Sequence, residues 1–190
     1  DIVAAYVSEN DIPNYAFYNC TNLQIVSLPH NLRSIGFWAF FGCALKRMIL
    51  PATIQRLAYE AIPDSVDTVT YLALPEGNNT FTNAKADRLG LANFLGPMLG
   101  QGIRVQLCYT YLHQGNLAAA DTVLPFDLNV AMRADGDTLL MVMVSENNFV
   151  GAKWLLDHGA DVDKRSEGTT PLMNAIYDPP HVSIIRLLLH

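Results

Sequence analysis

The residue types that most often carry out chemistry in proteins lie far apart in this sequence. No paired cysteines have zinc-site spacing. The five histidines are scattered as His30, His113, His158, His181 and His190. Cys108 and His113 are five residues apart on a predicted helix, so they do not share a face and form no nucleophile and base pair. We therefore expect no catalytic, cofactor-binding or metal-ligating residue in this chain, and no enzyme activity in this segment.

Other ligand classes are equally poorly supported. The glycines of Gly96–Gly102 lack the lysine and the preceding strand of a phosphate-binding loop. The longest purely apolar run, Leu139–Val144, is far shorter than the roughly 20 residues that span a bilayer. Residues 63–190 carry fourteen acidic and eight basic side chains, which accounts for the whole net charge of −6. This charge disfavours a polyanion, so we expect no nucleic acid and no membrane insertion.

The dominant feature of the sequence is internal repetition with two different periods. Ala16-Phe17 recurs as Ala39-Phe40, 23 residues later. Near the C-terminus, Thr138-Leu139-Leu140-Met141 recurs as Thr170-Pro171-Leu172-Met173, 32 residues later. Periods of about 20 to 50 residues are typical of solenoids, whose stacked units present long surfaces rather than a single pocket. The pattern therefore predicts a repeat solenoid with α and β parts, and it favours binding over catalysis.

Each N-terminal unit has a turn-helix segment that ends at a cysteine, followed by an alternating strand that ends at a proline. Cys20 and Pro29 occupy these places in one unit, and Cys43 and Pro51 in the next. Stacking places the strands in a parallel sheet, with the aromatic segments on the opposite side. From Ile12 to Pro75 the sequence resembles BspA-like leucine-rich repeats.

This resemblance implies a curved, strand-faced solenoid used for protein recognition. Ile2–Val7 fits the strand of a preceding unit, and Ala61-Ile62, with no cysteine after it, marks a degraded unit that closes the array. At Phe37 the family usually has a polar residue. Phe37 either joins Trp38 and Phe41 in an exposed aromatic patch or packs on the adjacent unit.

Polar residues separate the two arrays. Glu76–Thr80 is a polar turn run, and Ala84–Leu95 reads as an amphipathic helix that Gly96-Pro97 ends. We expect this helix to cover the open end of an array. The predicted organisation is therefore leucine-rich repeats over 1–76, a polar loop and connecting helix over 77–101, and an all-α array over 102–190.

The C-terminal array has the sequence marks of paired helices. Gly159 fits a helix C-cap, Thr170 fits an N-cap, and Pro171 fits the first helical turn, which needs no N–H. Together with the Gly159–Asp163 segment, these residues resemble ankyrin repeats. The resemblance implies about three units, of which we expect the last to be incomplete.

In ankyrin proteins, partners contact the hairpin tips and the inner face of the first helices. By this resemblance, the residues that would contact a partner are Ala134, Asp135, Asp137, Ser145, Glu146, Ser166, Glu167, Thr169, Tyr177 and Asp178. Five of the ten are acidic, and they form either a solvated surface or a true recognition face. A true face would select a basic partner that has a place for Tyr177.

The favoured interpretation is an intracellular scaffold for protein–protein interactions. It would act in the cytoplasm, or in a host cytoplasm if the protein is a translocated bacterial effector. An alternative is a targeting module for an enzyme whose catalytic domain lies outside residues 1–190. A second alternative is a secreted adhesin at the cell surface, although an odd number of cysteines fits a reducing compartment better.

Overall fold

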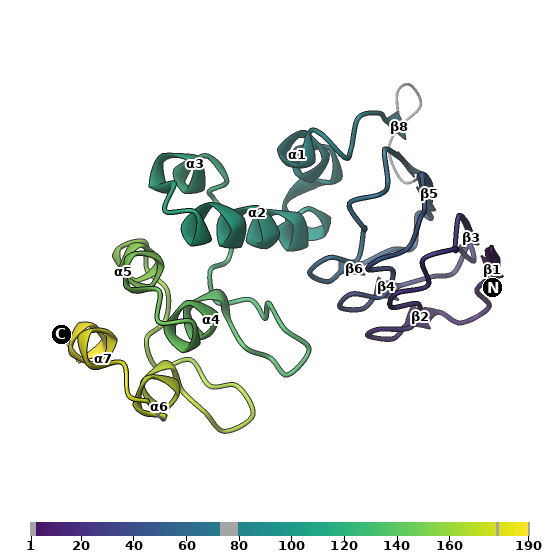
Figure 1. The fold of residues 1–190 in the computed structure, drawn as a ribbon. Coiled ribbons are helices and arrows are strands. Elements are labelled where there is room, and N and C mark those ends of the chain that lie inside the picture. The colour runs from purple at the N-terminus through teal and green to yellow at the C-terminus, as the bar shows by residue number, and fades with distance from the viewer. Residues whose placement is uncertain (1–2, 73–79, 178, 190) are drawn as a thin grey trace. The chain divides into compact units, whose positions relative to one another are not determined.

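The short apolar strands of the N-terminal part stack at the repeat period (Figure 1). The computed structural model describes residues 3–72, 80–177 and 179–189, and the chain divides into two units, Asp1–Arg104 and Val105–His190. The two units are described separately below.

One edge of each N-terminal unit is a strand in which exposed and buried residues alternate. These strands are β1 (Ala4–Tyr6), β3 (Ile25–Ser27), β5 (Arg47–Leu50) and β7 (Thr68–Tyr71). β1 pairs with β3 and β5 with β7, both in parallel, and β3 packs beside β5. The predicted parallel stacking is confirmed, and β1 lies within the predicted Ile2–Val7 segment. Leu74, Pro75 and the turn residues 76–79 lie outside the described residues.

The sequence did not predict a second parallel sheet, which runs along the other edge of the same units. Its strands, in the order β2-β4-β6, are β2 (Asp11–Ile12), β4 (Ser34–Ile35) and β6 (Arg56–Leu57). Each has only two residues, too few to show a period of two. A polar link supports the sheet, because Asp11 accepts a hydrogen bond from the Ser34 hydroxyl at 2.6 Å.

The aromatic segments between the sheets form consecutive turns rather than short helices. Their backbones are joined across units at regular positions, with Tyr15 N donating to Phe37 O at 2.9 Å and Phe17 N to Ala39 O at 2.7 Å. Inside this ladder Phe40 is fully buried, and the Phe17 ring stacks on it at 5.2 Å. Apolar burial and backbone pairing therefore repeat with the same period.

Two elements close the described part of the first unit. β8 (Thr80–Phe81) pairs antiparallel with β7, and helix α1 (Arg88–Leu99) packs on β6. The predicted helix over 84–95 therefore starts later and continues further, with a single non-helical residue at Gly96, where φ is 79°.

Arg88 attaches α1 to the last repeat of the first unit. It is only 9% exposed and donates to Ile62 O at 2.9 Å, and its Nε lies 3.8 Å from Asp64 Oδ1. Burial lowers the pKa of Arg88, while Asp64 and Glu60 oppose that change. This contact agrees with the expectation that the connecting helix covers the end of the leucine-rich array.

Three pairs of antiparallel helices follow the boundary (Figure 1). The helices are α2 (Gln101–His113), α3 (Leu117–Thr122), α4 (Leu139–Ser145), α5 (Phe149–Asp157), α6 (Pro171–Ile176) and α7 (Val182–Leu188). α4 packs on both α5 and α6, so its residues 139–144 are all buried. The core of the second unit therefore lies around α4.

The helix ends match their predicted caps. Thr170 Oγ1 accepts a hydrogen bond from Met173 N at 3.3 Å, with Pro171 in the first turn of α6. Gly159 follows α5 with a φ of 90°, a conformation that glycine adopts without strain. Asn129 Oδ1 accepts from Asp161 N at 2.8 Å, a contact that connects equivalent loops of successive units.

Candidate interaction surfaces

The described residues contain no group of three or more His, Cys, Asp or Glu side chains that could hold a metal ion. His158, the C-cap of α5, stacks on Trp154 at 4.0 Å between ring centroids. Asp121 accepts a hydrogen bond from the Trp154 indole at 2.9 Å, so this cluster connects two units. The part of the chain that the structure describes also lacks a helix with the length and apolarity needed to cross a bilayer.

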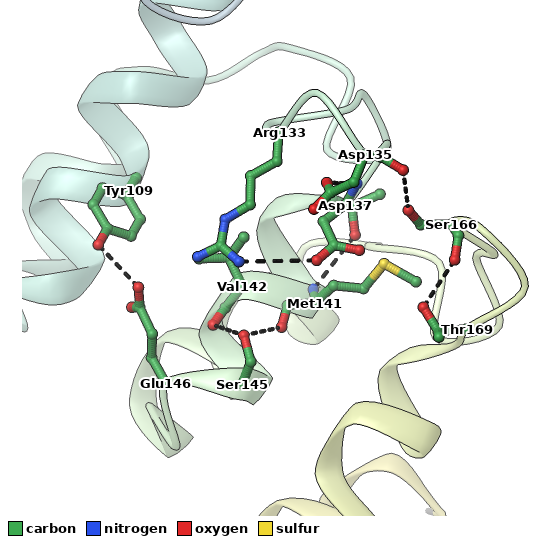
Figure 2. A network of polar contacts seen from close by, with 11 residues as sticks. Tyr109, Arg133, Asp135, Asp137, Met141, Val142, Ser145, Glu146, Ser166 and Thr169 are labelled. Carbon is green, nitrogen blue, oxygen red and sulfur yellow. Dashed lines mark hydrogen bonds and ion pairs between the residues drawn. The ribbon is translucent and has the colours of Figure 1, made fainter. Parts of the chain in front are cut away.

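The predicted hairpin-tip residues lie in two neighbouring loops (Figure 2). The buried Ser166 hydroxyl donates to Asp135 O at 2.8 Å, which joins the tip after α3 to the tip after α5. Within each tip, Asp135 Oδ1 accepts from Asp137 N at 3.1 Å, and Ser166 pairs with Thr169 in a short antiparallel bridge. Ala134 is half-buried beside this contact. These bonds hold the two tips together.

Other predicted residues lie at the opposite ends of the first helices. The Ser145 hydroxyl donates to Met141 O and Val142 O, both at 3.0 Å, and Glu146 follows it as the C-cap of α4 (Figure 2). Tyr177 follows α6 and is 83% exposed. Asp178 lies outside the described residues.

The described acidic side chains of this set differ in their pairing. Asp137 lies 3.9 Å from Arg133, and its side chain is only 15% exposed. Glu146 accepts a hydrogen bond from the Tyr109 hydroxyl at 3.0 Å and lies 3.7 Å from His113. Glu167 is exposed, at a left-handed position with a φ of 44°. Glu167 is therefore the acidic side chain of this set that is best placed to meet a partner.

The aromatic residues of the first unit form a ladder on its turns. Tyr18 stacks on Phe41 at 5.4 Å, and Tyr15 lies 5.5 Å from Trp38. Tyr15 and Tyr18 are both 44% exposed, and Phe41 is 39% exposed. Phe37 is half-buried, and its backbone N–H donates to Asn14 Oδ1 of the preceding unit at 2.9 Å. The exposed aromatic surface thus includes two tyrosines that were not among the predicted contact residues.

A carboxyl group replaces the aromatic ring in the third unit. Tyr15, Trp38 and Glu60 occupy equivalent left-handed positions, with φ of 62°, 50° and 52°. Burial raises the pKa of Glu60, and hydrogen bonds from Trp38 and Tyr59 together with the charge of Arg88 oppose that increase. The last position of the ladder is therefore polar.

Sequence reasoning overlooked Tyr15 and Tyr18 because it treated the aromatic segments as packing elements. A signal was available, since Tyr15 and Trp38 are 23 residues apart, as are Tyr18 and Phe41. It also could not reveal that Tyr109 contacts Glu146, because that hydrogen bond spans 37 residues and two units.

Comparison with known families gives two matches. The family described as BspA type Leucine rich repeat region (6 copies) matches residues 8–86, and the family described as Ankyrin repeats (3 copies) matches residues 107–190. No curated protein matches the chain.

Proposed function

Because this chain joins BspA-type leucine-rich repeats to ankyrin repeats, we propose that it is a scaffold with one protein-recognition surface in each array. Repeats of both kinds are generally protein–protein interaction modules, and stacked units provide extended surfaces for this purpose. The proposal assigns no catalytic step to residues 1–190.

The observation that carries the proposal is the joining of the two ankyrin tips. Ser166 connects the backbones of both loops, so the residues around it are ordered before a partner arrives. Preorganised loops lose less conformational entropy on binding than flexible loops do. Glu167 and Tyr177 remain exposed and would supply the charge and the aromatic contact that recognition requires.

Site-specific photo-crosslinking with the whole chain tests the proposal. A crosslinking amino acid replaces Glu167, Tyr177 or, as a control, Lys153 on the second helix of its pair. We expect the same partner to be captured from positions 167 and 177 and not from 153. Equal capture at all three positions would show non-specific adhesion and contradict the scaffold.

The charge of the tip gives a second, kinetic measurement once a partner is captured. Glu167→Lys should slow association with a basic partner, and the slowing should diminish as salt screens the charge. Asp157→Lys is the control, because Asp157 is an exposed acid that pairs with Lys153 on α5. Equal effects of the two variants would remove the acidic tip from the proposal.

The compartment we propose is the cytoplasm, of the source cell or of a host cell that receives the protein. Support comes from the three free cysteines, of which Cys43 and Cys108 are buried as thiols. Fractionation of cells that make the native protein tests this, and a pool found only outside the cell would contradict it.

A further inference from the structure

The exposed face of the first strand ladder combines apolar and cationic side chains. Along β5, Met48 and Leu50 are buried, so Arg47 and Ile49 are exposed on the other face. Ile25 on the neighbouring β3 is 62% exposed, and Ile49 is 57% exposed. Exposed isoleucines on adjacent strands are unusual at a solvated surface and are typical of contact areas.

A hollow of about 520 Å³ lies on this face. The residues around it come from four strands and the turns before them: Gln24, Ile25, Val26, Lys46, Arg47, Met48, Ile49, Thr68, Thr70 and Thr80. Thr70 and Thr80 share a hydrogen bond at 2.9 Å between their hydroxyl oxygens, which ties β8 to β7 beside the hollow. The hollow therefore lies on backbone that is held by strand pairing.

The charges around the hollow have a single sign. Lys46 and Arg47 are exposed, and neither forms an ion pair with another described residue. Of the described residues that line the hollow, none is acidic. Two uncompensated cations within a chain of net charge −6 favour an anionic ligand at this place.

The apolar part of the hollow selects among anionic ligands. A nucleic acid needs many phosphate contacts, which two cations do not provide. A free phosphate or sulfate would leave Ile25 and Ile49 in water. A polypeptide that places a carboxylate next to an aliphatic side chain satisfies both the cations and the isoleucines.

We infer that this hollow binds a segment of a protein partner in which Asp or Glu stands next to Ile, Leu or Val. The carboxylate meets Lys46 and Arg47, the aliphatic side chain covers Ile25 and Ile49, and the threonine hydroxyls hydrogen-bond the backbone of the segment. This inference rests on the proposed recognition function and names the partner chemistry for the leucine-rich array.

Selection from a random ten-residue peptide library on the immobilised whole chain tests the chemistry without a known partner. We expect the retained peptides to be enriched in acidic residues next to aliphatic ones. The variant Lys46→Glu/Arg47→Glu should lose this enrichment and retain lysine-containing peptides instead. The control Arg56→Glu/Lys85→Glu makes the same charge change at exposed positions outside the hollow and should retain the acidic peptides.

Fluorescence anisotropy with one selected peptide then measures affinity. Lys46→Glu/Arg47→Glu should raise Kd by at least about tenfold, and Ile49→Ser should raise it by several-fold because it removes the apolar contact. The control double variant should change Kd less than about twofold. Circular dichroism of every variant checks that the repeats remain folded.

The outcomes separate this inference from the proposed function. Basic or unbiased selected peptides, or equal losses in the two double variants, would overturn the hollow as an acidic-segment site. If the ankyrin tips still capture a partner in that case, the scaffold survives without this surface. If neither array retains a ligand, both the inference and the proposed function are wrong.

Discussion

Two cysteines of the chain are protected by the stack of repeats. Burial raises the pKa of Cys43 to about 11, with a further increase from the neighbouring Cys20, and burial raises the pKa of Cys108 to about 12. The Cys43 thiol also donates to Phe17 O of the preceding unit at 3.1 Å. These side chains act as small core residues, which is the role the repeat spacing of Cys20 and Cys43 indicated.

Thiol reactivity should therefore differ sharply among the three cysteines. In the native chain at about pH 8, half-buried Cys20 should react with an aromatic disulfide reagent, and Cys43 and Cys108 should react only after denaturation. The Cys20→Ala variant should lack the fast reaction. Three thiols reacting at one rate under native conditions would contradict the described burial.

The position of Glu60 predicts a pH effect on stability. Its pKa is raised above the ordinary value of 4.5 in the folded chain, so its contribution to stability is full below that value and is lost as pH rises through the folded pKa. Glu60→Gln keeps a neutral side chain and should gain stability relative to the wild type between about pH 4 and pH 8.

Urea midpoints of Glu60→Gln and wild type across that range measure the difference. Glu9→Gln is the control, because Glu9 is exposed. A Glu60→Gln difference that stays constant with pH would show that burial does not shift this carboxyl.

At the scale of elements, loops and helix ends use serine in two ways. Ser166 is 5% exposed and bonds a carbonyl of the neighbouring hairpin, whereas Ser145 is exposed and bonds carbonyls of its own helix. Only the first arrangement connects two elements. A buried carbonyl that loses its donor keeps the desolvation cost, whereas an exposed one is served by water.

Ser166→Ala should therefore lower the free energy of unfolding by about 1–2 kcal/mol, and Ser145→Ala should change it by less than about 0.5 kcal/mol. Hydrogen exchange at the tip residues 134–137 should accelerate in the first variant alone. Equal effects of the two substitutions would mean that the tips are not joined through Ser166.

The same scale shows what the sequence could predict and what it could not. β3, β5 and the helix pairs around α4 were predictable because motifs such as Leu28-Pro29 and Thr170-Pro171 recur with constant spacing. β2, β4 and β6 were missed because strands of two residues have no alternation to recognise. Contacts such as the Arg133–Asp137 ion pair depend on how a loop folds, so residue type alone could not reveal which acids are paired.

At the scale of the whole molecule, the two units have separate cores and one tryptophan each. Trp38 lies in the turns of the first unit, and Trp154 lies on α5 of the second. Contacts in a solenoid are mostly between neighbouring repeats, so stability is approximately a sum over units and their interfaces. A core substitution in one unit should therefore act first on that unit.

Leu45→Ala should lower the stability of the first unit by about 2–5 kcal/mol, because Leu45 is fully buried. In a Trp154→Phe background, Trp38 fluorescence should report a lower denaturation midpoint. In a Trp38→Phe background, Trp154 fluorescence should shift much less. Equal shifts from both reporters would show that the 190 residues unfold as one cooperative block.

The ring ladder of the first unit also gives the protein an internal optical gauge. Phe17 and Phe40 are nearly parallel, with 2° between their planes, and Tyr18 and Phe41 are within 13° of parallel. Rings that repeat along a solenoid move apart or tilt when the solenoid bends. Near-ultraviolet circular dichroism, which depends on the mutual orientation of aromatic rings, should therefore follow changes in the curvature of the leucine-rich array without any added label.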